Sequence, residues 1–108
     1  MYLAMNRFRI VPGQEAAFED IWRKRDSYLR DVPGFKSFTL LRGPVQDDHV
    51  LYASHSVWDS EAAFRDWTRS EAFRAAHASA GDSRALYLGP PAFEGFAEVA
   101  GVGTTRDG

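Results

Sequence analysis

The stretch FKSFTLLRGPVQDDHVLYASHSVW, residues 35–58, decides the fold. It contains two runs typical of β-strands, at 35–43 and 49–58, and the turn-rich link PVQDD separates them. Two such runs joined by a short polar segment predict a β-hairpin. We therefore expect two adjacent antiparallel strands at the centre of the chain.

On the N-terminal side, the hairpin is preceded by a strand pattern and a helical pattern. YLAMNRFRIV at 2–11 is typical of a strand, and Pro12-Gly13 closes it. Residues 14–32 place apolar side chains at helical spacing, and Pro33-Gly34 ends that run. A strand and a helix are therefore predicted before the hairpin.

On the C-terminal side, the same two kinds of element follow in reverse order. Asp59 or Ser60 can cap a helix that runs to about Arg69, and FEGFAEVAG at 93–101 predicts a last strand. The complete order is β-α-β-β-α-β. It predicts an α+β fold, the ferredoxin-like plait, with a four-stranded antiparallel sheet and both helices on one face.

Composition sets the broad class of the protein. The chain has 108 residues, a net charge of −2 and no cysteine. We expect a single domain over 1–101 and a flexible C-terminal tail at 102–108. The charge argues against nucleic acid as a partner, and no apolar run is long enough for a signal peptide or a membrane span. A cytoplasmic location is the expectation.

The predicted sheet has apolar residues on both faces. In the first strand, Leu3 and Met5 lie on the face opposite Ala4 and Phe8. The helices cover one face only, and the other face would expose a large apolar patch. We therefore predict a homodimer that packs sheet on sheet.

Asn6 is a polar residue on a strand face that is otherwise apolar. It shares that face with Ala4, Phe8 and Ile10, which should point into the helix-covered core. A buried amide without a partner costs about 1–3 kcal/mol. Asn6 is therefore either bonded to nearby backbone or aimed as a donor into a cavity.

Two further residues stand out from their surroundings. Arg25 lies near the centre of the apolar stripe of residues 14–32, where a charge either snorkels to an edge or binds an anion at the mouth of a pocket. His77 stands among alanines in FRAAHASAG, residues 73–81. It is either an ordinary solvated or core histidine, or an axial metal ligand with clearance for a wide macrocycle.

Common catalytic motifs do not occur in the chain. The three histidines lack the spacing of a zinc site, and no P-loop, Rossmann glycine fingerprint or GxSxG elbow occurs. Hydrolase chemistry and nucleotide cofactors are therefore disfavoured.

Several segments together carry a recognisable pattern. They are NRFRIVPG (6–13), FEDIWRKR (18–25), PGFKSFTLL (33–41), the strand ending in VW at 58 and FRDWTRSEAFRAAH (64–77). Over roughly residues 2–100 the chain resembles the antibiotic-biosynthesis-monooxygenase superfamily, and more narrowly its IsdG-type haem-degrading monooxygenases. The resemblance implies a dimeric α/β-barrel built from two plaits.

The resemblance also implies roles for four residues. Asn6, Trp67 and His77 match the family's catalytic triad: His77 would be the proximal haem-iron ligand, Trp67 would press on the porphyrin and Asn6 would hydrogen-bond on the distal side. Arg25 would contact a haem propionate. Haem would then be substrate and cofactor at once, and O₂ with electrons from an external donor would open the ring and release iron.

Two other functions remain compatible with the sequence. One is cofactor-independent oxygenation of an aromatic or quinol substrate, as in other members of the superfamily. The other is a non-enzymatic, dimeric module that binds haem.

The spacing of Trp67 and His77 predicts a break between them. In one straight helix they would lie about 15 Å apart along the axis and roughly 80° apart around it. Ser70 can cap a second, shorter helix, and a turn there would fold the two segments around one cavity.

Overall fold

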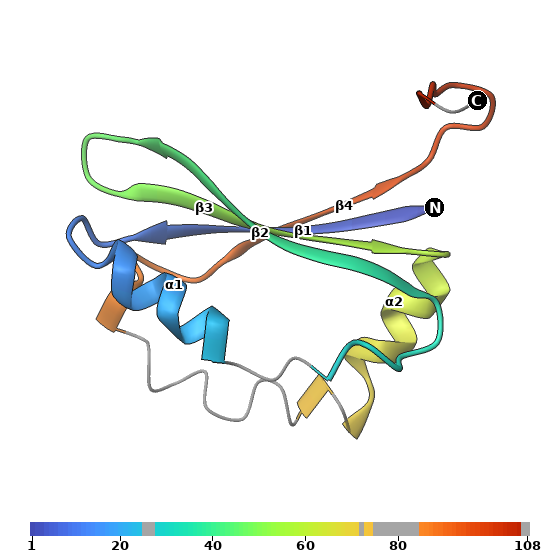
Figure 1. Cartoon of the computed structure of the whole chain (residues 1–108), viewed down its shortest axis with the longest axis horizontal. Helices are drawn as coiled ribbons and strands as arrows, with labels where there is room; N and C mark the ends of the chain where they lie inside the picture. The colour runs from blue at the N-terminus through green and yellow to red at the C-terminus, as the bar shows by residue number, and fades with distance from the viewer. Residues whose placement is uncertain (25–27, 72, 75–84, 107–108) are drawn as a thin grey trace.

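The computed structural model describes residues 1–24, 28–71, 73–74 and 85–106. The elements in chain order are β1 (Tyr2–Ile10), α1 (Glu15–Lys24), β2 (Phe35–Val45), β3 (Val50–Trp58), α2 (Glu61–Thr68) and β4 (Ala92–Ala97) (Figure 1). This is the predicted order β-α-β-β-α-β, so the ferredoxin-like plait is confirmed.

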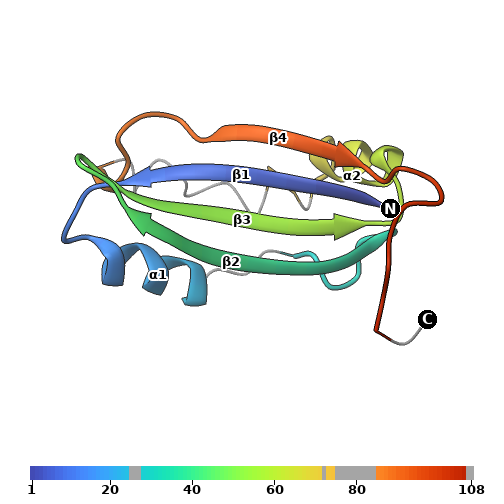
Figure 2. The ribbon, with the colours of Figure 1, turned by 90° about the horizontal axis from the view of Figure 1, so that it is seen from above.

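The four strands form one antiparallel sheet in the order β2-β3-β1-β4. Both helices lie on the same face of this sheet (Figure 1). Seen from the opposite face, α1 lies near β2 and α2 lies near β4, at opposite corners of the sheet (Figure 2). The middle of β1 and β3 therefore lies between the two helices.

The buried core on the helix-covered face is divided into two clusters that share no residue. Cluster A, next to α2, consists of Tyr2, Ala4, Leu29, Trp58 and Phe64. Cluster B, next to α1, consists of Phe8, Ile10, Phe18, Val50 and Tyr52. Each helix therefore buries one phenylalanine against its own end of the sheet.

The helix predicted over 14–32 is shorter than expected. Helix α1 ends at Lys24, and the described residues from Tyr28 to Gly34 form no helix. Tyr28 has a φ of 58°, which breaks helical geometry. Leu29, part of the same apolar stripe as Phe18, packs in cluster A rather than in cluster B. The stripe therefore serves two separate clusters.

The caps predicted around α2 are confirmed. Ser60 is the N-cap, and its hydroxyl accepts a hydrogen bond of 3.1 Å from the Ala63 amide. The helix ends at Thr68, and the Ser70 hydroxyl accepts a 3.1 Å hydrogen bond from the Phe73 amide. Ser70 therefore starts a new helical turn after a break.

The last strand is also shorter than predicted. Strand β4 ends at Ala97, and residues 98–106 leave the sheet (Figure 1). Glu98 is held by the N-terminal ammonium of Met1 at 3.0 Å. Beyond this ion pair Val99 and Val102 are exposed.

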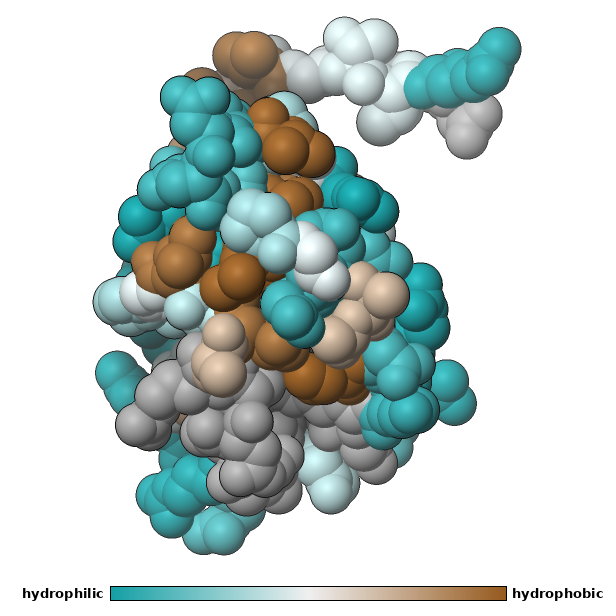
Figure 3. Space-filling model, turned by 90° about the vertical axis from the view of Figure 1, so that its left-hand side faces the viewer, coloured by the Kyte–Doolittle hydropathy of each residue, from teal (hydrophilic) through white to brown (hydrophobic). Residues whose placement is uncertain are grey.

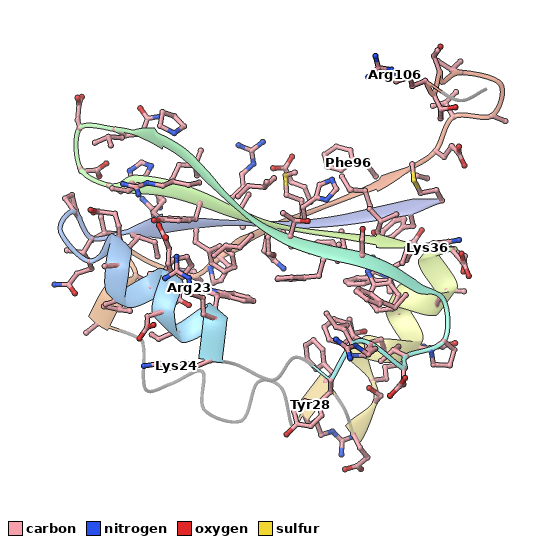
Figure 4. The ribbon with its side chains drawn as sticks, in the orientation of Figure 1. Arg23, Lys24, Tyr28, Lys36, Phe96 and Arg106 are labelled. Carbon is pink, nitrogen blue, oxygen red and sulfur yellow. The ribbon has the colours of Figure 1, made fainter. Side chains whose placement is uncertain are left out.

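The face of the sheet opposite the helices carries apolar side chains. Leu3 pairs with Phe96 across β1 and β4, and Phe96, which is 47% exposed, points away from the helices (Figure 4). Leu41 of β2 is 42% exposed and pairs with Ala53 on the same face. From the α1 end of the molecule, hydrophobic residues gather in a central band between hydrophilic flanks (Figure 3).

Candidate functional site

Asn6 lies at the centre of the sheet, on the face that the helices cover. It alternates with Ala4 of cluster A and Phe8 of cluster B, so it occupies the boundary between the two clusters. Asn6 is half-buried, and its side chain forms no hydrogen bond to another described residue. The expected position of Asn6 is therefore confirmed, whereas its role in chemistry stays a prediction.

Ser54, which was not among the residues predicted from the sequence, lies directly opposite Asn6 on β3. A signal was available, because Ser54 shares the face of Val50, Tyr52 and Trp58, all of which are large and buried. A serine at such a position is as anomalous as an asparagine. The position of Ser54 beside Asn6 follows from the register of β1 and β3, which the sequence does not give.

Two tryptophans border the clusters on either side of this polar pair. Trp67, at the end of α2, packs on Trp58 of cluster A with ring centroids 5.4 Å apart and meets Phe73 edge to face at 4.9 Å. Trp22 of α1 packs on cluster B and stacks on Phe38 at 5.5 Å and 20°. Broad aromatic surfaces therefore lie on both helices.

Helix α1 is held to the sheet by a polar contact beside the site. The hydroxyl of Tyr52, which is 1% exposed, donates a 2.5 Å hydrogen bond to Glu19. Glu19 also contacts Arg23 at 3.0 Å and Arg42 at 3.5 Å. Figure 4 shows Arg23 on α1 beneath the sheet.

This contact shifts the pKa values of Glu19 and Tyr52 in opposite directions. The hydrogen bond from Tyr52 and the charges of Arg23 and Arg42 lower the pKa of Glu19. Burial, together with the bond to the Glu19 carboxylate, raises the pKa of Tyr52 to about 12. Glu19 is thus ionised and Tyr52 neutral at physiological pH, which keeps the bond charge-assisted.

Arg25 and His77, the other two predicted site residues, lie outside the described residues. The structure therefore brings Asn6 and Trp67 to the helix-covered side of the sheet and leaves the other two positions as predictions. The break at Ser70 is confirmed within the described residues, since α2 ends at Thr68 and Ser70 caps a new turn.

A groove of about 1190 Å³ runs between residues 28–34 and α2. Trp67 contributes to its wall, together with Leu29, Val32 and three aspartates, Asp31, Asp59 and Asp66. Asn6 is not among its lining residues. Three aspartates against one arginine, Arg30, make the groove unfavourable for an anionic ligand, and Trp67 is the one described candidate residue that borders it. We therefore place the candidate site over Asn6 and Ser54.

The described part of the chain offers no protein-only metal site. No three His, Asp or Glu side chains within it lie close enough together to hold a metal ion. No helix within the same residues is long and apolar enough to cross a membrane.

These features define a ferredoxin-like plait whose helix layer is divided above a polar pair in the sheet. Residues 1–79 match the family model described as antibiotic biosynthesis monooxygenase. The chain therefore belongs to the antibiotic biosynthesis monooxygenase family.

Similar proteins include both haem-degrading and cofactor-independent enzymes. A "heme-degrading monooxygenase" of Listeria welshimeri is 35% identical over 57 residues, a match that spans 52% of this chain and only 47% of the Listeria protein. The heme-degrader MhuD of Mycobacterium tuberculosis, solved with two hemes in its active site, is 27% identical with a TM-score of 0.71, over 95% of this chain and all of MhuD. SnoaB, a cofactor-independent oxygenase from Streptomyces nogalater, is 28% identical with a TM-score of 0.65, over 91% and 92% of the two chains.

Proposed function

We propose that this protein is a haem-degrading monooxygenase, which binds haem and uses O₂ and external electrons to open the porphyrin ring and release iron. The observation that carries the proposal is the divided helix layer. It leaves two polar side chains, Asn6 and Ser54, between apolar clusters bordered by Trp22 and Trp67. The likeness to MhuD, with its two bound hemes, supports the same ligand.

The described residues fit a flat, largely apolar ligand that has a polar reacting centre. Indole and phenyl surfaces from α1, α2 and β2 can cover a porphyrin, since large aromatic rings bury much area and stack on flat partners. Asn6 offers an uncharged amide donor at the centre of the sheet. The chain would thus supply orientation and local polarity, and it needs no acid–base dyad of its own.

The four predicted residues take distinct parts in this proposal. Bound haem supplies an iron that activates O₂ once it is reduced. His77 would be the protein ligand of the haem iron, and Arg25 would pair with a propionate. Trp67 presses on the ring, and it is itself backed by Trp58, which is fully buried. Asn6 donates a hydrogen bond at the reacting centre.

A second candidate function is cofactor-independent oxygenation of an aromatic or quinol substrate. The likeness to SnoaB favours it, because SnoaB matches this chain at nearly the same identity as MhuD. In that case Asn6 and Ser54 would bind an oxygen of the organic substrate.

Titration with ferric haem distinguishes these functions. We expect a sharp Soret band that saturates near one equivalent or a small integer number of equivalents. Ascorbate in air should then bleach the band and yield an open-chain tetrapyrrole, identified by mass. Absence of the band would contradict the haem assignment, and a band that stays unchanged would indicate a binding module.

Three substitutions test the proposed roles. His77→Ala should abolish or severely weaken axial ligation, so an unchanged haem spectrum would remove His77 from the site. Trp67→Phe should keep haem binding but slow turnover, because a smaller ring exerts less pressure. Asn6→Ala should bind haem and lose oxygen activation, and wild-type turnover would leave Asn6 a purely structural amide.

We also propose that the protein is a homodimer that packs through the open face of the sheet. Leu3, Leu41 and Phe96 give that face an apolar surface, and the ion pair between Arg7 and Glu94 lies beside them. Burial of such a patch against a second copy would remove it from water.

A further inference from the structure

Within the described part of the chain, Ser54 is the one buried side chain among the serines, threonines, amides and charged residues. It is 6% exposed. It lies on the helix-covered face of β3, between Tyr52 of cluster B and Trp58 of cluster A, so both clusters end next to it. A hydroxyl at this depth has little access to water, so a hydrogen bond to a bound ligand would be favourable.

The strand register places Ser54 and Asn6 side by side. They are directly opposite each other on β3 and β1, and the same row of the sheet ends in Leu40 on β2 and Phe93 on β4. Residues opposite each other in an antiparallel pair have Cβ atoms about 4.5–5.5 Å apart. One small atom above this pair would therefore lie within hydrogen-bonding reach of both side chains.

The neighbouring Ser56 shows what an internally satisfied hydroxyl looks like on this face. Its hydroxyl donates to the Ala4 carbonyl at 3.3 Å and accepts from the Trp58 indole at 3.0 Å. Among the described residues, the Ser54 hydroxyl has no side-chain hydrogen bond comparable with those of Ser56. The Ser56 hydroxyl thus stabilises the fold, whereas the Ser54 hydroxyl is available to bind a ligand.

We propose that Ser54 acts with Asn6 as a second hydrogen-bond donor to a small ligand at the reacting centre of the site. It is a positioning residue, which fixes where that ligand sits relative to the haem. The inference rests on the proposed function, since it takes haem as the larger ligand. Two donors on adjacent strands would orient a small ligand more tightly than Asn6 alone.

The test uses azide as the probe of the ferric haem complex. Ser54→Ala should bind haem within about twofold of the wild type, because a porphyrin is held mainly by apolar contact. Its affinity for azide should fall about tenfold, the expected scale for one lost hydrogen bond to an anion. Ser54→Thr, which keeps the hydroxyl, should restore most of that affinity.

Ser56→Ala is the matched control. It should leave azide affinity unchanged and lower stability in urea, because it removes the internal partner of Trp58. Ser54→Ala should show the opposite pattern, with weaker azide binding and an unchanged urea midpoint.

Three outcomes would overturn the inference. Wild-type azide affinity in Ser54→Ala, with normal haem binding, would overturn it and leave the proposed function intact. A large loss of stability in Ser54→Ala would show that the hydroxyl serves the fold instead. Absence of a Soret band in the wild type would overturn the proposed function, and the inference with it.

Discussion

Replacement of Tyr52 by phenylalanine should weaken the attachment of α1 to the sheet in a pH-dependent way. The substitution keeps the ring, which packs on Phe18 at 4.8 Å, and removes only the hydroxyl that donates to Glu19. A hydrogen bond to a charged group is worth about 1.5–3 kcal/mol. Glu19 retains Arg23 and Arg42, so no carboxylate is left unpaired, and we expect a loss of about 1.5 kcal/mol at pH 8.

The pH dependence follows from the raised pKa of Tyr52. Its folded pKa of about 12 lies above the ordinary value of 10.0, so the neutral hydroxyl is the favoured form in the folded protein. The stability that neutral Tyr52 contributes is fully present below the pKa of the tyrosine in the unfolded chain. It is lost as the pH rises through the pKa of Tyr52 in the folded protein. Between about pH 8 and about pH 11.5, the wild type should lose about 2 kcal/mol relative to Tyr52→Phe.

Urea unfolding followed by tryptophan fluorescence, at both pH values, measures this difference. Tyr2→Phe is the matched control, because Tyr2 is also buried, at 5% exposed, and its hydroxyl donates to no described carboxylate. Its effect on the free energy of unfolding should be smaller, because no charge-assisted hydrogen bond is lost. A constant gap between wild type and Tyr52→Phe across this range would refute the raised pKa of Tyr52, which burial and the bond to Glu19 cause together. Equal stability of the two proteins at pH 8 would refute the role assigned to the Tyr52–Glu19 bond.

Three further substitutions test the fold and the assembly. Gly34→Ala should lower the free energy of unfolding by more than about 1 kcal/mol, because the φ of Gly34 is +83° and a Cβ there would clash with that of Ala63. Gly13→Ala is the control: Gly13 has a φ of +92° but no atom within 4 Å of an added Cβ, so its thermal melt should shift less. Ser60→Ala removes the cap of α2 and should cost about 1 kcal/mol in urea unfolding, whereas Ser60→Asp should retain most of the stability. Phe96→Glu should convert the proposed dimer to monomers in sedimentation velocity, whereas Ile21→Glu, which charges an exposed position on α1, should not; a Phe96→Glu dimer would contradict the sheet-on-sheet interface.

The order of elements was predictable because each element has a clear local signal. The central hairpin, the cap at Ser60 and the break at Ser70 all depend on residues within a few positions of each other. The extent of the first helix was not predictable in this way. Periodicity shows that Phe18 and Leu29 are buried, but it does not show that they pack in different clusters. Nor does tyrosine at position 28 signal a positive φ.

The candidate site was predictable only in part, for a related reason. Asn6 stood out because an amide is conspicuous between apolar neighbours on one strand. Ser54 is small and common in strands, and its meaning comes from a partner 48 positions away in sequence, across the register of β1 and β3. The Tyr52–Glu19 bond likewise joins a strand to a helix over a long separation. Contacts of this kind require the topology to be known first.

The division of the core into two clusters has a thermodynamic consequence. A ligand bound over Asn6 and Ser54 would contact both clusters, and its binding free energy would add to the stability of the folded protein. At a free concentration one hundred times its Kd, such a ligand stabilises a domain by about 2.7 kcal/mol. For a chain of this size that corresponds to a rise in Tm of roughly 10 °C or more. The melting temperature is therefore a direct, label-free readout of which flat molecules the domain accepts.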